Sequence, residues 1–177
     1  MPKPRYIIQA MTAGEMMLPE FDQEMAGARK ILERVPDDKL SWKPHAKSMT
    51  MGRLAQHISE IPGLAFKVLS EDSLDVAPPG AAPRQAPAPL SKAQMIEVFD
   101  KGVAAAREAI AKATDEQLRQ PWSLLKGGQA LFTLPRAALL RTMALNHMIH
   151  HRAQLGVYLR LNDIPLPGLY GPSADES

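Results

Sequence analysis

The chain has 177 residues, the size of one ordinary domain, and 45% of them are apolar, which supports a folded core and excludes a wholly disordered chain. Aromatic residues are only 5%, which favours helices over sheet. The 21 basic and 19 acidic residues nearly cancel, so we expect no nucleic-acid partner, and the absence of cysteine excludes disulfides and thiolate metal sites.

Neither a secretory leader nor a membrane span is expected. The apolar run in residues 1–17 is broken by Gln9, Thr12 and Gly14 before a secretory core could form. No stretch reaches the roughly 18 uncharged apolar residues of a membrane span. We therefore expect a cytoplasmic protein that does not bind membranes.

Helical periodicity marks the first two elements. Apolar residues recur at spacings of three and four over residues 18–35, and Pro36 ends this helix. The second helix follows Thr50 as its N-cap and continues to Val68. Pro62 and Gly63 lie inside it, so we expect a kink or a local break there.

A proline-rich connection and a third helix follow. Residues 78–89 contain five prolines and predict a loop. Ser91 begins the next helix, and Gln94 completes a capping box. The face of this helix expected to point inward has small side chains that allow close helix packing: Met95, Phe99, Gly102, Ala106 and Ile110.

The C-terminal third holds the longest predicted helix. Residues 122–131, around Gly127 and Gly128, are expected to be irregular or to form a short hairpin. Thr133 is expected to cap a helix that runs to about Leu161, and the tail 162–177 is irregular. These elements predict an all-α fold, a four-helix bundle with long loops in a single domain over residues 1–177.

Two histidines on the last helix suggest a metal site. His147 and His151 are four residues apart, so both side chains lie on one face of the helix and can bind one divalent ion. Leu140, Met143, Leu155 and Tyr158 share that face, which predicts that it points inward. His57 lies on the corresponding stripe of the second helix, and three neutral imidazoles would leave coordination positions open for water or substrate.

Other interpretations of the histidines stay open or fail. An inward histidine is often a hydrogen-bonded core residue rather than a ligand. A HExxH protease motif fails because Met148 stands where the glutamate would be, and a di-iron site fails because no glutamate lies three residues before a histidine. We expect His150 to face sideways, toward solvent or a subunit contact, and His45 to lie on the surface.

Several short motifs, in order and separation, resemble those of the DinB-like (DinB/YfiT-like) proteins, a family of candidate metalloenzymes. They are Leu40-Ser41-Trp42-Lys43-Pro44, Ser48-Met49-Thr50-Met51-Gly52-Arg53-Leu54-Ala55-Gln56-His57-Ile58, Asn146-His147-Met148-Ile149-His150-His151-Arg152-Ala153-Gln154-Leu155 and Pro167-Gly168-Leu169-Tyr170-Gly171-Pro172-Ser173. The resemblance spans about residues 17–175. It implies a four-helix bundle in which His57, His147 and His151 hold one metal ion, nickel or zinc first, with iron or manganese as alternatives.

The resemblance also suggests a function. Several such proteins are linked to the transfer of low-molecular-weight thiols, so we expect a metal-dependent thiol transferase acting on a small molecule; the alternative is a non-catalytic stress-related binding protein. No catalytic acid or base is assigned, although Arg152, Gln154 and Tyr158 are candidates for the surroundings of the ligands. The resemblance implies a homodimer, for which Met16, Leu145 and Ile149 could form a two-fold patch; the alternative is that they pack under the tail around Leu169 and Tyr170.

Overall fold

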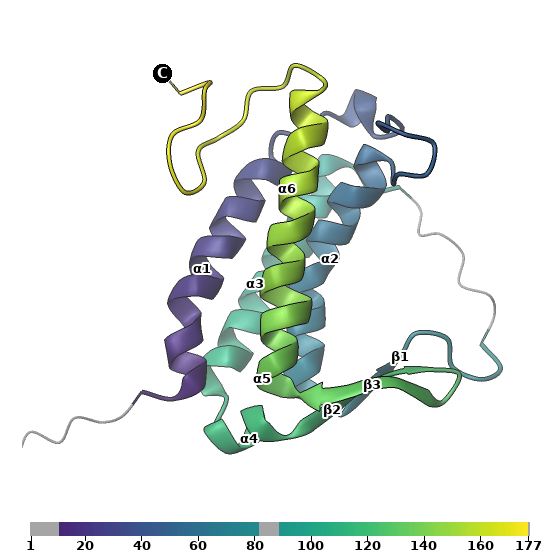
Figure 1. Ribbon diagram of the computed structural model, residues 1–177, viewed down its shortest axis with the longest axis vertical. Coiled ribbons are helices and arrows are strands. Elements are labelled where there is room, and N and C mark those ends of the chain that lie inside the picture. Colours follow the sequence, from purple (N-terminus) through teal and green to yellow (C-terminus); the bar gives the residue numbers. More distant parts are fainter. Residues whose placement is uncertain (1–10, 82–88, 177) are drawn as a thin grey trace, which may run out of the picture.

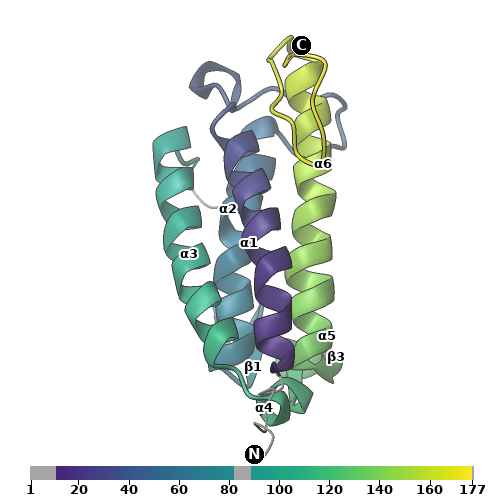
Figure 2. The same cartoon turned by 90° about the vertical axis from the view of Figure 1, so that its left-hand side faces the viewer.

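The computed structural model describes residues 11–81 and 89–176, and most of this part is helical (Figure 1). The N-terminal residues 1–10 and the middle of the predicted proline-rich loop lie outside it. Four long helical stretches pack side by side: α1 (Ala13–Leu32), α2 (Met51–Ser70), α3 (Lys92–Lys112), and a last stretch made of α5 (Arg136–Leu139), the π-helical segment η2 (Leu140–Asn146) and α6 (His147–Arg160). Around this helical body the order of neighbours is α1, α3, α2, α6 (Figure 2).

Short helices and a small sheet complete the fold. The short helices are η1 (Asp37–Lys39) and α4 (Asp115–Arg119). Strands β1 (Ser73–Asp75), β2 (Pro121–Lys126) and β3 (Gln129–Pro135) form a sheet at one end of the helices, with β1 parallel and β3 antiparallel to β2 (Figure 1). The expectation of an all-α chain is therefore wrong.

A tight hairpin explains this sheet and confirms the hairpin alternative for residues 122–131. Gly127 and Gly128 have φ angles of 63° and 77°, which glycine adopts without strain in a two-residue turn. The carboxylate of Asp75 accepts hydrogen bonds from both of their amides, so β1 is fastened to the turn. Thr133 lies within β3 and does not cap a helix, because the last helical stretch begins only after Pro135.

The local signals at the helix starts are confirmed. Thr50 caps α2, and Ser91 with Gln94 forms the capping box of α3. Of the two alternatives expected at Pro62, a kink or a local break, the break does not occur, since α2 continues as one helix to Ser70. Close packing at Gly102 is confirmed, because a Cβ there would lie 3.0 Å from the backbone nitrogen of Gly63.

Gly14 gives the tightest test of this packing. A Cβ at position 14 would lie 2.5 Å from the backbone oxygen of Ile110, so Gly14→Ala must push α1 away from α3. We expect it to lower the free energy of unfolding by about 1–3 kcal/mol. Gly156→Ala is the control: its Cβ would meet no atom within 4 Å, so the better helix former should stabilise the protein by about 0.5–1 kcal/mol. Urea unfolding measures both, and equal effects would contradict the packing argument.

The C-terminal tail is held against the helices by a buried ion pair. Arg152 on α6 and Glu24 on α1 are 2.7 Å apart, with side chains only 3% and 6% exposed. The hydroxyl of Tyr170 in the tail donates to the Glu24 carboxylate at 2.8 Å and accepts from Arg152 at 2.5 Å. Gly27 leaves room for the guanidinium, because a Cβ there would lie 2.6 Å from Arg152 Nη1. The tail is thus irregular in backbone but fixed in place.

One residue of the predicted two-fold patch is misplaced. Leu145 is 1% exposed and belongs to the core, so it cannot contribute to a surface between subunits. Ile149 is half-buried and Met16 is 62% exposed. The error arose because the core face of the last helix is centred on Met148 and Leu155, with Leu145 three residues before Met148 on the same side.

Candidate metal centre

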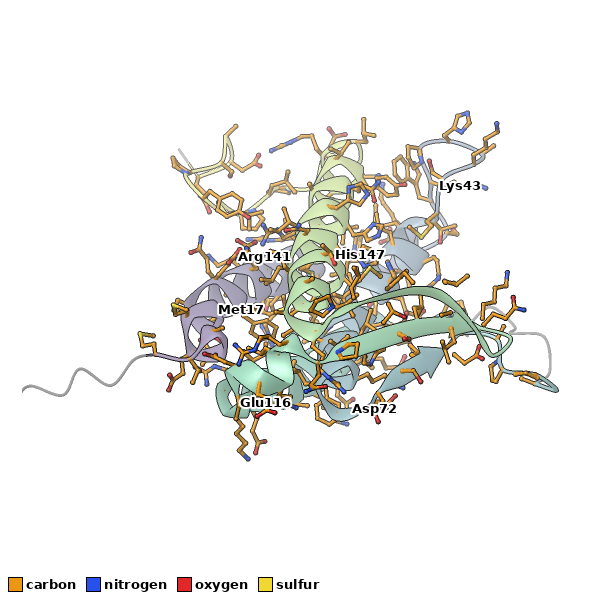
Figure 3. The ribbon with its side chains drawn as sticks, turned by 60° about the horizontal axis from the view of Figure 1, so that its bottom comes forward. Met17, Lys43, Asp72, Glu116, Arg141 and His147 are labelled. Carbon is orange, nitrogen blue, oxygen red and sulfur yellow. The ribbon has the colours of Figure 1, made fainter. Side chains whose placement is uncertain are left out.

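The three predicted histidines meet where α2 and α6 pack against each other. His57 Nε2 lies 3.2 Å from His147 Nε2, and His151 Nε2 lies 2.8 Å from the same atom. All three potential ligand atoms are within 4.8 Å of one another. In Figure 3, His147 lies on the side of α6 that faces α2. The fold thus brings His57 next to two histidines that lie 90 and more residues later in the chain.

The histidines flank the core instead of lying within it. On α6 the buried stripe comprises Met148, Arg152, Leu155 and Leu159, and an α-helix places His147 about 100° around from Met148. All three histidines are accordingly half-buried. The expectation that their stripe is the inward face therefore needs correction, and the observed position leaves the imidazoles partly exposed to solvent.

The spacing of the nitrogens fits a metal ion. A divalent ion binds imidazole nitrogen at about 2.0–2.1 Å, so the nitrogen atoms of two such ligands at octahedral or tetrahedral angles are about 2.8–3.4 Å apart. The observed 2.8 and 3.2 Å are close to that range. Without an ion, three nitrogen atoms that converge this closely must share protons or repel. The donor set therefore suits a metal better than an empty cluster.

Neighbouring groups determine which nitrogen of a candidate ligand carries the proton. The Nδ1 atom of His151 lies 2.8 Å from the side-chain oxygen of Gln154, an acceptor, so Nδ1 carries the proton and Nε2 presents its lone pair. Among the described residues, Nδ1 of His147 is buried and has no hydrogen-bond partner of good geometry. Gln154 is thus a supporting residue, as the sequence suggested.

The surroundings keep the imidazoles neutral. Burial, then the nearby charges of His151, His147 and Arg53, lower the pKa of His57 to about 4. Burial and then His151 lower the pKa of His147, while the Met143 carbonyl opposes this. Burial also lowers the pKa of His151, against the bond to Gln154. All three are therefore unprotonated at neutral pH, the state that metal binding requires.

The lowered pKa values of the three histidines make the stability of the metal-free protein depend on pH. A histidine whose pKa is depressed on folding binds fewer protons in the native state than in the unfolded state, where the value is 6.5. We expect the free energy of unfolding, measured in chelator, to rise from about pH 4 to about pH 6.5 and then level off. The rise should be smaller in His57→Gln. A stability that falls over this range would contradict the neutral cluster.

The remaining residues that the sequence singled out do not join the cluster of three histidines. His150 is exposed, with its ring 4.8 Å from that of His151, and His45 is exposed on the loop before α2. Arg152 faces α1 through Glu24 and so does not reach the histidines. Tyr158 packs edge-on against Trp42, with ring centroids 5.5 Å apart.

Sequence reasoning missed two residues at this site. Arg53 and Glu60 lie four residues before and three residues after His57, on the same side of α2, and their side chains pair at 3.4 Å. The helical spacing from His57 was the available signal. Charged residues on a helix surface are usually solvated, so the sequence pattern alone does not mark Arg53 and Glu60 as part of a site.

Within the described residues, no helix combines the length and apolarity needed to cross a lipid bilayer.

Comparison with known proteins identifies the family. The model of the DinB family matches residues 10–177. The uncharacterized protein YrdA of Bacillus subtilis (strain 168) is 26% identical over 160 residues, covering 90% of this chain and 89% of its own. Two solved structures share the fold. A DinB-like protein from Bacillus cereus ATCC 10987 has a TM-score of 0.67 and is 23% identical, with 92% of this chain and all of that chain covered. The DinB-like protein YjoA from B. subtilis has a TM-score of 0.62 and is 20% identical, with 92% of this chain and 99% of that chain covered. The chain belongs to the DinB family.

Proposed function

We propose that this protein is a single-domain four-helix-bundle metalloprotein in which His57, His147 and His151 hold one divalent ion. The convergence of the three Nε2 atoms supports the proposal most directly. Nickel and zinc are the first candidates because imidazole suits both, with iron or manganese as alternatives. A bound ion would supply Lewis acidity, which lowers the pKa of a coordinated thiol or water.

The proposed activity is transfer of a low-molecular-weight thiol to a small-molecule substrate, in the cytoplasm. The chain has no cysteine, so the sulfur must arrive with a co-substrate. Three protein ligands leave positions on the ion for that sulfur. The imidazoles are only half-buried, so they are partly exposed to solvent. No catalytic acid or base is assigned.

Two measurements test this function. Protein purified without a histidine tag should contain close to one metal ion per chain by elemental analysis, and His150→Ala, which changes an exposed neighbour, should keep it. A screen of several thiols against several electrophiles should then show conjugation that chelator removes and metal restores. Metal-free protein that takes up no ion on titration would refute the metal site. Metal-loaded protein inactive with every thiol would favour the alternative, a non-catalytic binding protein.

The proposed assembly is a homodimer. Met16 is exposed, and Ile149 is half-buried on α6, so both remain available to a second subunit. Sedimentation at micromolar concentration should give twice the mass of the chain. A monomer at that concentration would reject the dimer.

A further inference from the structure

The helices that carry the histidines are almost free of acidic residues. Glu60 is the only acid in α2, and the stretch from Arg136 to Asn162, which includes α5, η2 and α6, has none. Residues 39–59 also lack acids but contain Lys39, Lys43, Lys47 and Arg53. Figure 3 shows Lys43 on the loop that precedes α2. Three neutral imidazoles would leave the charge of a bound ion uncompensated, so the site favours an anionic ligand.

Arg53 is the arginine beside the histidines. The four arginines of the last helical stretch all bind acids elsewhere: Arg136 with Asp72, Arg141 with Glu20, Arg152 with Glu24 and Arg160 with Asp175. Arg53 lies four residues, about one turn, before His57 on the same side of α2, so helix geometry places its side chain next to that of His57. Its partner Glu60 lies on the other side of His57 along α2.

The pairing of Arg53 is weaker than that of comparable arginines. Arg53 donates to Glu60 through Nη1 at 3.4 Å, with the two side chains 39% and 41% exposed. Arg107, which is similarly exposed, donates to Asp22 through two nitrogens at 2.8 and 3.0 Å. A ligand carboxylate could therefore take the two-nitrogen geometry that Glu60 does not use.

We infer that Arg53 forms an anion subsite beside the metal centre, and that the thiol taken by this protein carries a carboxylate, which replaces Glu60 on Arg53. The inference rests on the proposed function and narrows its substrate class. The aromatic pair of Trp42 and Tyr158 lies at the same end of the site: the Trp42 carbonyl accepts from the amide of Met51, two residues before Arg53, and Tyr158 lies two turns beyond His151 on the same side of α6. This pair can pack against the carbon chain of the ligand.

The test uses calorimetry on zinc-loaded protein with three probes: 3-mercaptopropionate, 2-mercaptoethanol and propionate. We expect the wild type to bind mercaptopropionate about tenfold more tightly than mercaptoethanol, the size of one charge-assisted hydrogen bond. Arg53→Met should remove this preference without changing zinc content or mercaptoethanol affinity, and Arg53→Lys should retain part of it. Glu60→Gln should strengthen mercaptopropionate binding, because the competing carboxylate is gone. Arg107→Met, at an exposed pair far from His57 in the sequence, is the matched control.

Equal affinities for the two thiols in the wild type would overturn the inference while leaving metal-bound thiol chemistry intact. A preference that survives in Arg53→Met would also overturn it, because the ion alone would then be binding the carboxylate. If zinc-loaded protein binds neither thiol, the proposed thiol function fails. Propionate then tests the anion subsite on its own: its affinity must be about tenfold lower in Arg53→Met than in the wild type, and an unchanged affinity would refute the subsite.

Discussion

His147→Ala is expected to weaken metal binding at least about a hundredfold, because the Nε2 atom of His147 lies 3.2 Å from that of His57 and 2.8 Å from that of His151, between the two other proposed ligands. Removing it leaves His57 and His151, which can supply two ligands only. Competition with a chromophoric chelator measures the change. His150→Ala is the matched control, since it deletes an exposed imidazole one residue from His151 and should bind metal like the wild type.

The same variant separates metal binding from folding. An ion bound only by the native state stabilises it by mass action, about 2.7 kcal/mol when free metal is at a hundred times the dissociation constant. Chelator should therefore lower the Tm of the wild type and of His150→Ala, but leave that of His147→Ala nearly unchanged. Equal shifts in all three proteins would mean that the ion binds elsewhere.

Glu24→Ala is expected to cost about 3–5 kcal/mol of unfolding free energy, a large part of the stability of an ordinary domain. It leaves the Arg152 guanidinium, 3% exposed, without its carboxylate. It also removes the acceptor of the Tyr170 hydroxyl, so the tail should become sensitive to limited proteolysis.

Asp22→Ala provides the control for that measurement. It breaks the pair with Arg107, whose side chains are 52% and 42% exposed, and such pairs contribute about 0–1 kcal/mol. Chemical denaturation compares the two variants. Similar losses would show that burial does not set the strength of the Glu24 pair.

The features predicted well from the sequence depend on residues close together in the chain. The caps at Thr50 and Ser91 are bonds between positions three apart, so their patterns are visible locally. The histidine trio was also accessible, because helical spacing places His147 and His151 on one face of the last helix and His57 on the apolar stripe of the second, and the family resemblance points to the same three residues. In contrast, β1 pairs with β2, where Ser73 lies opposite Ser123. No local sequence pattern predicts a strand partner 50 residues away, so this strand pairing was not expected.

The centre of a helix face is harder to predict than its existence. On α6 the histidine stripe and the Met148 stripe both recur every three or four residues, and the choice between them depends on how α1 and α2 pack against the helix. Arg152 belongs to the buried stripe because Glu24 of α1 compensates its charge. From the sequence alone an arginine argues against burial, and nothing local to Arg152 shows that Glu24 lies opposite it.

The π-helical segment η2 bears on how sequences of this family should be aligned. Its wider turns take up one residue more than an α-helix of the same length. On one side of it, Arg136 is bonded to the backbone oxygen of Glu71 at the end of α2, and on the other side His147 faces His57 in the middle of the same helix. A chain with one residue fewer between positions 140 and 146 would keep both attachments on a regular helix. A one-residue gap at this position in an alignment therefore indicates a relative in which the π-helical segment is a regular α-helix. The histidines that follow the gap in that relative correspond to His147 and His151.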